Sequence, residues 1–391
     1  MNELIRKKLD TEDLIREDLV ALSKSIYARP ELGYEEHYAS ELHVALLEKH
    51  GFQVERAYLG LKTGFRAEYH STVPGPVICY MAEYDALPGI GHGCGHNILG
   101  ATSTGAGILL QKLMGNLGGT VVVLGTPAEE TSGAKVFYVE KGAFDDVSAA
   151  MIAHPGTGHY RSGSSLALEA IEFDYKGKAS HAASEPEKGV NALDAAIGTF
   201  NMINALRQQT REDARIHGII TKGGVAANII PDDCAAQFYV RAKSKAYLAE
   251  LVEQVKNCAR GAAAAAGVWL EIVEYEAGYD NMVTNQRLSD LYSAQLRSLG
   301  VTEILEPRKT YGSLDAGNVS HVCPTIHPYF PITEDREMAA HTKEFGVCTL
   351  SEYAEENMMI TAKALALTGA ALMKDVSLLE DIKKEFAVAE K

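Results

Sequence analysis

The chain has 391 residues, of which 46% are hydrophobic and 23% are charged, and this composition is typical of globular proteins rather than disordered or fibrous ones. Its formal net charge is -15 and it has no long basic run, which argues against a nucleic-acid partner and favours small ligands. Two domains are expected, because single hydrophobic cores usually stop growing below this length.

The N-terminal stretch, MNELIRKKLDTEDLIRE, has a charged helical pattern and lacks the apolar core of a signal peptide. No apolar segment is long enough to span a bilayer. The six cysteines are scattered, without the spacing of a disulfide framework. We therefore expect a cytoplasmic protein with reduced thiols and no membrane partner.

Helical periodicity predicts two helices, over residues 11–28 and 39–52, joined by RPELGYEEHY. Apolar runs then predict buried strands over 76–84, 119–127, 147–155 and 323–330, with a helix over 100–114 between the first two. A long helix is expected over 349–373. Strands that alternate with helices indicate an α/β fold with a mainly parallel sheet.

From about residue 165 the pattern changes to shorter, alternating strands. Strands are predicted over 165–179, 214–224, 234–242 and 268–279, and helices over 191–206 and 245–267. The resulting order, β-α-β-β-α-β, is that of a ferredoxin-like domain. We therefore expect an α+β domain over residues 165–280, inserted into an α/β domain formed by residues 1–164 and 281–391.

Side chains capable of metal binding and acid–base chemistry follow three of the predicted strands. The first strand leads to Asp85, Cys94 and His96, the second to Glu129 and Glu130, and the third to His154. Ligands of open α/β sheets bind outside the carboxyl ends of the strands. These three segments are therefore expected to contribute to one site.

The residue types suit a metal site. Cys94 and His96 lie in GCGH, where glycines let the backbone turn so that a thiolate and an imidazole can bind one ion. Adjacent carboxylates at a buried strand end need a compensating cation, and one can bind it while its neighbour accepts a proton from water. Each motif alone has a plainer explanation, a buried cysteine beside a surface histidine or a solvated acidic turn. Their convergence favours the metal site.

Short motifs extend along nearly the whole chain in the order RPELGYEEHYASE, AEYDALPGIGHGCGHN, GTPAEE, AHP, KASHAA, ANIIPD and AAHTKEF. Together they resemble the dinuclear-metal amidohydrolase and carboxypeptidase family, which includes aminoacylases, hippurate hydrolase and auxin-conjugate hydrolases. Two segments are more similar to the aminobenzoyl-glutamate hydrolase and β-alanyl-lysine dipeptidase branch. They are GSLDAGNVSHVCPTIHPYF and CGHN, where the hippurate branch typically has CGHD. The resemblance implies a catalytic α/β domain interrupted by a lid and dimerisation domain.

The resemblance also implies roles for individual residues. The metal ligands of two divalent ions would be Cys94, His96, Glu130, His154 and His341. Glu129 would be the general base, and Asp85 would orient a ligating histidine. His181 would reach the partner subunit's site and stabilise the oxyanion, assisted by Asn228, while Arg241 would bind a substrate carboxylate.

We therefore expect a homodimeric, metal-dependent hydrolase that cleaves the amide bond of N-acyl amino acids or dipeptide-like substrates with a free carboxylate. Zinc or manganese is expected, and nickel or cobalt also suits these ligands. Two alternatives stay open: a cysteine hydrolase with Cys94 as nucleophile and His96 as base, and a non-catalytic ligand-binding relative. The role of His92 is open, and for His321 and His327 a structural or pocket-lining role is favoured.

Overall fold

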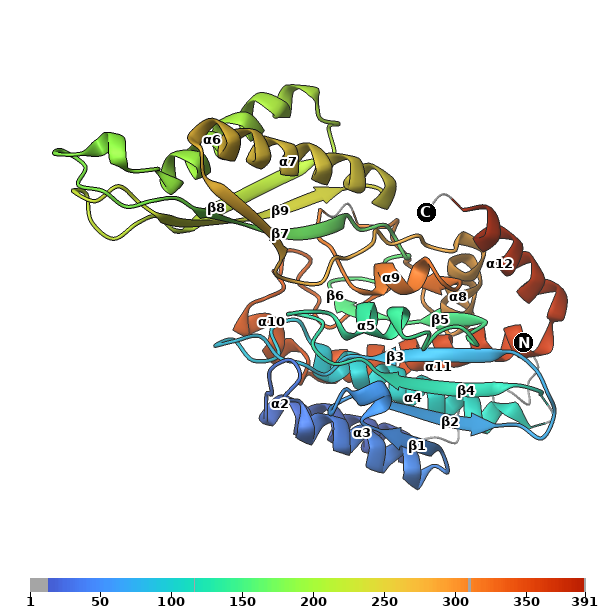
Figure 1. The fold of residues 1–391 in the computed structure, drawn as a ribbon. Coiled ribbons are helices and arrows are strands. Elements are labelled where there is room, and N and C mark those ends of the chain that lie inside the picture. Colours follow the sequence, from blue (N-terminus) through green and yellow to red (C-terminus); the bar gives the residue numbers. More distant parts are fainter. Residues whose placement is uncertain (1–12, 116, 309–310, 390–391) are drawn as a thin grey trace. The chain divides into compact units, whose positions relative to one another are not determined.

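The computed structural model describes residues 13–115, 117–308 and 311–389 (Figure 1). The part of the expected N-terminal helix before residue 13 lies outside the described residues. The chain divides into two compact units. The second unit contains Ser165–Asn281 and Tyr311–Leu314, and the first contains the described residues on either side of these segments.

The first unit is built on a six-stranded sheet of order β1-β2-β4-β3-β5-β11. Its strands are β1 (Gln53–Arg56), β2 (Phe65–His70), β3 (Val77–Ala82), β4 (Thr120–Gly125), β5 (Ala149–Met151) and β11 (Thr325–Ile326). The neighbours from β4 to β11 pair in parallel, as expected, whereas β1 and β2 form an antiparallel edge that the apolar pattern did not predict. Strand β1 is mostly exposed and has no apolar run to reveal it.

Two of the predicted strands each divide into two pieces. The run over 147–155 forms β5 and then β6 (His154–Gly156), and the run over 323–330 forms β11 and then β12 (Tyr329–Pro331). Strands β6 and β12 pair in parallel in a separate two-stranded sheet. The prediction of continuous strands was wrong because both pieces of each run are largely buried, so the apolar pattern continues through the break.

The helices of the first unit are α2 (Asp13–Ala28), α3 (His37–Lys49), α4 (His96–Met114), α5 (Ala134–Glu140), α8 (Gln286–Ser298), α9 (Ala316–Ser320), α10 (Lys343–Cys348), α11 (Glu352–Lys374) and α12 (Val376–Val388). Helix α4 is buried over most of its length and contacts β3, β4, α2 and α11 (Figure 1). A Cβ atom at Gly107 would lie 2.3 Å from Val123 Cγ2, so only glycine permits this close packing. The helix begins at His96, earlier than expected, at the carboxyl end of β3.

The second unit has the predicted ferredoxin-like order. Its elements are β7 (Ala167–Lys176), α6 (Ala192–Leu206), β8 (Arg215–Lys222), β9 (Asp233–Ala242), α7 (Lys245–Ala266) and β10 (Trp269–Glu274). They form an antiparallel sheet of order β10-β7-β9-β8, and α6 and α7 pack together against it. The alternating burial of β7 and β9 explains why period-two patterning identified them.

In the described ranges, no helix combines the length and apolarity needed to cross a membrane. The six cysteines are free thiols, as expected.

A buried ion network connects three elements of the first unit. Lys135, on α5, is fully buried, and its Nζ donates to Glu83 Oε1 at 2.7 Å and to Asp315 Oδ1 at 2.6 Å. Glu83 directly follows β3, and Asp315 directly precedes α9. A buried charge without a partner is very costly, so these three side chains must be retained or replaced together.

We expect Lys135→Ala to lower the free energy of unfolding by about 3–5 kcal/mol, because it leaves two buried carboxylates without their cation. The control is Lys49→Ala, which removes the largely exposed pair with Asp18 and should cost at most about 1 kcal/mol. Chemical denaturation of both variants provides the comparison. Equal losses would contradict the importance of the buried network.

Candidate active site

Glycine places Cys94 close to His154. Gly95 has φ +82° and a Cβ atom there would lie only 2.7 Å from Pro155 Cγ, so the loop approaches β6 more closely than other residues permit. The approach leaves Cys94 Sγ 3.4 Å from His154 Nε2. The carboxyl ends of two strands thus contribute to one cluster.

The two glutamates and His341 come from turns with unusual backbone conformations, whereas His96 begins α4. Glu129 and Glu130 follow Ala128, which has φ +61°, and His341 itself has φ +63°. The His341 amide donates to Gly93 O at 2.9 Å, which connects this turn to the Cys94 loop. His341 Nε2 lies 3.5 Å from Glu130 Oε1.

These side chains form three groups whose potential ligand atoms lie within 4.8 Å of one another. The groups are Cys94, His96 and His154; Cys94, Glu130 and His341; and His96, Glu129 and Glu130. Because the groups share members, they form one connected cluster. The structure therefore brings together all five expected ligands and the expected general base, a set large enough for two ions.

Unpaired buried atoms in this cluster fit a cation. His96 Nε2 and Glu130 Oε1 are buried and have no hydrogen-bond partner among the described residues, and they lie 4.0 Å apart. Leaving two such atoms unpaired costs free energy, and an ion that accepts a lone pair from each removes this cost. The combination of sulfur, nitrogen and oxygen donors is typical of zinc sites and suits related divalent metals.

Hydrogen bonds orient the ligands toward this position. His96 Nδ1 lies 2.8 Å from Asp85 Oδ1, and the Glu130 amide donates to Asp85 Oδ2 at 2.9 Å. The Nδ1 atom of His154 lies 2.7 Å from Pro155 O. In both histidines the Nδ1 hydrogen bond places the ring proton on Nδ1 and directs the Nε2 lone pair toward the cluster. Asp85 therefore occupies the position expected for an orienting carboxylate.

The surroundings influence protonation. Burial raises the pKa of Glu129, and the nearby carboxylates of Glu83 and Asp315 raise it further, so this side chain readily holds a proton. Burial also raises the pKa of the Cys94 thiol. Without a cation the thiol stays protonated at neutral pH, which disfavours the cysteine-nucleophile alternative.

The remaining expected site residues lie on the second unit. His181 is exposed, and its Nδ1 accepts from the amides of Ala183 and Ser184 at 3.3 and 3.1 Å. Its proton therefore resides on Nε2, where the ring can donate. Asn228 O accepts from the Ala182 amide at 3.0 Å, so the two expected lid segments are paired.

Arg241 lies on β9 and is half-buried. Its Nη1 donates to Ser313 Oγ at 3.2 Å, and within the described chain no carboxylate lies at ion-pair distance. A guanidinium without an acidic partner can bind a carboxylate bidentately. Its role in substrate binding stays a prediction.

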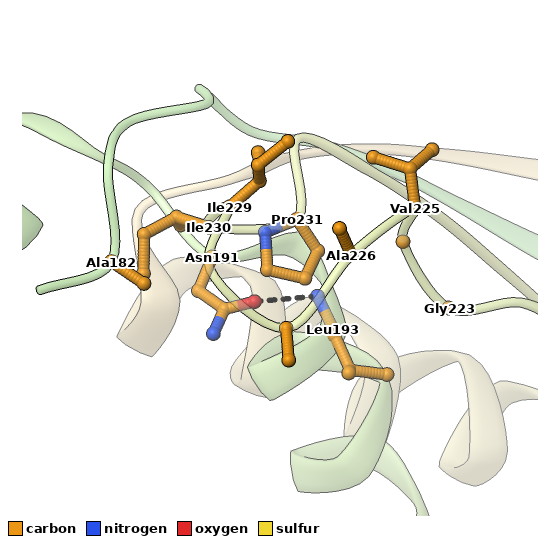
Figure 2. A pocket seen from close by; sticks show the side chains of 11 residues that line it. Ala182, Asn191, Leu193, Gly223, Val225, Ala226, Ile229, Ile230 and Pro231 are labelled. Atoms are coloured by element: carbon orange, nitrogen blue, oxygen red, sulfur yellow. Dashed lines mark hydrogen bonds between the residues drawn. The ribbon is translucent and has the colours of Figure 1, made fainter.

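A pocket of about 430 Å³ lies on the second unit beside these lid segments (Figure 2). Its lining is mostly apolar and comes from Ala182, Asn191, Leu193, residues 223–227 and residues 229–231. The polar side chain of Asn191 caps α6 by accepting from the Leu193 amide at 3.0 Å. None of these lining residues has a titratable side chain, so the pocket lacks the groups needed for hydrolysis.

Two further residues lie beside the cluster although neither was among the expected ligands. Glu83 Oε2 lies 3.3 Å from His96 Nε2, and its position two residues before Asp85 in AEYD was the only signal. His327 is buried, and its ring stacks on that of His154 with centroids 5.6 Å apart. This contact fits the favoured structural or pocket-lining role.

His92 and His321 lie outside the three ligand groups. His92 is buried with its ring centroid 6.4 Å from that of Tyr27, and burial lowers its pKa to about 4. A neutral ring packed in this way fits a structural role. His321 directly follows α9.

The chain is similar to known proteins over most of its length. The family model of the M20 peptidase dimerisation domain matches residues 168–266. The chain is 37% identical to an Xaa-Arg dipeptidase of Mus musculus, covering 98% of this chain and 92% of the relative. It is 30% identical to one of the polypeptides of p-aminobenzoyl-glutamate hydrolase from Escherichia coli (strain K12), covering 78% and 67% respectively. The structure of a dinuclear metal binding peptidase from Bacillus subtilis, of the M20 family, matches with a TM-score of 0.72 at 22% identity, over 93% of this chain and 99% of that chain.

We expect the metal-free protein to bind Zn²⁺ or Mn²⁺ at two sites and His341→Ala to weaken or abolish one of them. His341 is 57% exposed, so its truncation should leave the fold intact. Titration calorimetry measures stoichiometry and affinity, and each ion should also raise Tm because it binds only the folded state. His37→Ala, an exposed histidine outside the cluster, is the control. Identical binding by both variants would contradict the ligand assignment.

Proposed function

This chain belongs to the M20 family of metal-dependent peptidases and amidohydrolases, and from this membership we propose that it hydrolyses dipeptides whose C-terminal residue is basic. The chain is a metal-dependent hydrolase of amide bonds in dipeptides or N-acyl amino acids. The observation that carries the finer proposal is the similarity to the Xaa-Arg dipeptidase, which extends over nearly the whole chain.

The proposed metal centre contains two divalent ions, zinc or manganese, with nickel or cobalt as further candidates. Its ligands are Cys94, His96, Glu130, His154 and His341. When bound, the ions supply Lewis acidity toward the amide carbonyl and the attacking water. The shared ligand groups and the unpaired buried atoms of His96 and Glu130 support this assignment.

Glu129 is the proposed general base. Its carboxylate takes a proton from the water that attacks the carbonyl carbon and delivers this proton to the leaving nitrogen, so that the amine departs neutral. The raised pKa of Glu129, which burial and neighbouring carboxylates cause in the metal-free protein, makes its carboxylate a stronger proton acceptor than an exposed glutamate. Asp85 holds the His96 ring and the Glu130 amide in place during the reaction.

The proposed lid comprises residues 165–280 and also forms the homodimer. His181 donates from Nε2 to the oxyanion in the partner's site, and Asn228 assists. The Nδ1 contacts of His181 support this tautomer, and the match to a peptidase dimerisation domain supports the assembly.

The proposed substrate carries opposite charges at its two recognition points. Arg241 binds the free C-terminal carboxylate. The formal net charge of -15 favours approach of a molecule with a cationic side chain over one with an acidic side chain. We place the enzyme in the cytoplasm, where free thiols such as its six cysteines stay reduced.

A panel of metal-loaded assays tests the substrate proposal. We expect kcat/KM to be highest for dipeptides ending in Arg or Lys, lower for dipeptides with a neutral C-terminal residue, and lowest for aminobenzoyl-glutamate and N-acetyl-cysteine. Product amino acids can be quantified by chromatography. A preference for aminobenzoyl-glutamate would overturn the basic-residue proposal while retaining amide hydrolysis.

We expect Glu129→Gln to lower kcat by roughly 10²–10⁴-fold, because the amide cannot accept the proton of water. Metal stoichiometry should stay unchanged. Glu140→Gln, at an exposed position on α5, is the matched control and should retain full activity.

Undiminished hydrolysis by Glu129→Gln would exclude its role as base. Activity that resists chelators but is lost on alkylation of Cys94 would instead support the cysteine hydrolase. No hydrolysis of any panel member by the metal-loaded wild-type protein would favour the non-catalytic alternative.

A further inference from the structure

The segment 31–36 packs over the turn that carries Glu129 and Glu130. A Cβ atom at Gly33 would lie 2.6 Å from Thr131 Oγ1 and 2.9 Å from Ala128 Cβ, so the two backbones approach as closely as glycine allows. The same segment contacts the loop beyond Asp85, because the Ala86 amide donates to Glu31 O at 2.9 Å. It therefore connects both loops that carry ligands after β3 and β4.

Glu36 makes the central polar contact between this segment and the turn. Its side chain is completely buried, and Oε1 accepts from the Ala128 amide at 2.8 Å. The other oxygen, Oε2, accepts from Thr63 Oγ1 at 2.9 Å, which fixes the carboxyl group from its opposite side. Thr63 is buried as well, so water does not compete for either bond.

The conformation of Ala128 explains why this contact matters. A left-handed conformation costs an alanine roughly 1–2 kcal/mol, and Ala128 adopts it at φ +61° while fully buried. Its amide would be a buried, unpaired donor without Glu36, at a further cost of about 1–3 kcal/mol. A relaxed turn would satisfy the amide differently and would change the direction of the next two side chains.

We propose that Glu36 is a positioning residue, whose carboxyl oxygen holds Ala128 in its left-handed conformation and thereby directs Glu129 and Glu130 into the metal cluster. The catalytic consequence rests on the proposed hydrolysis, whereas the consequence for metal binding rests only on the proposed ligand set. Glu36 acts through the backbone, because its carboxyl group accepts hydrogen bonds from Thr63 and Ala128 and not from the side chain of Glu129 or Glu130.

The contact needs an acceptor oxygen and not a negative charge. Burial, followed by repulsion from Asp85, raises the pKa of Glu36 to about 7, so near neutral pH the neutral carboxyl group is substantially populated. Glutamine has the same shape, can present its carbonyl oxygen to the Ala128 amide and can donate to the Thr63 hydroxyl. Alanine provides no acceptor.

The test compares Glu36→Ala with Glu36→Gln. For Glu36→Ala we expect metal affinity, measured by chelator competition, to fall by roughly 10–100-fold, as for other residues that orient ligands. At saturating metal its kcat should fall on the order of 10²-fold with KM unchanged, because the base is displaced while substrate contacts remain. Glu36→Gln should retain wild-type metal affinity and kcat.

Two controls separate positioning from general destabilisation. Glu35→Ala removes the neighbouring glutamate, which is 78% exposed, and should change nothing. Asn285→Ala removes the buried side chain that caps α8 and should lower Tm without altering metal affinity. Glu36→Ala behaving like Asn285→Ala would overturn the proposal, as would equal defects in Glu36→Ala and Glu36→Gln.

A double variant tests the route through Ala128 even if Glu36→Ala folds poorly. Glycine adopts φ +61° without strain, so Ala128→Gly in the Glu36→Ala background should regain part of the lost stability and metal affinity. No recovery would contradict the proposed route. Because chelator competition requires no substrate, these outcomes are independent of whether the dipeptide panel succeeds.

Discussion

The crowding of buried carboxylates at the carboxyl ends of β3 and β4 is the constraint on which the first unit depends. Like charges removed from water destabilise a fold unless positive charge or donors reach them. Lys135 compensates Glu83 and Asp315, while the His96 ring and a backbone amide satisfy Asp85. Divalent cations would complete this compensation for the remaining glutamates. Folding stability and metal binding are therefore parts of one electrostatic problem.

The fold was largely predictable where the pattern of apolar residues is typical of only one kind of element. The antiparallel unit was identified because β7 and β9 largely alternate between buried and partly buried residues. The central parallel strands were identified because their runs are uniformly apolar. The prediction failed where the pattern of apolar residues gives no signal. Strand β1 is mostly exposed, and the division between β5 and β6 falls inside a continuous apolar run, which carries no information about a change of sheet.

The residue types that form the candidate site were predictable from the sequence. The residues that hold them in place were less predictable. Cys94 and the two glutamates follow strand ends, where parallel topology makes their convergence expected, whereas His341 was proposed only from the family resemblance. Glu36 and Lys135 could not be found in this way. Each contacts residues distant in sequence, and a buried acid or base has no signature until its partners are placed.

The small sheet formed by β6 and β12 has a consequence for how the protein is made. His154 pairs in register with Tyr329, and His341 lies still further along the chain. A ribosome must therefore synthesise the chain as far as Tyr329 before β6 gains its strand partner, and as far as His341 before that donor can meet Cys94. Contacts so distant in sequence form late, because the intervening chain must first close into a loop. The complete metal site therefore forms only after His341 has been synthesised. A shorter nascent chain lacks this ligand and cannot hold every ion.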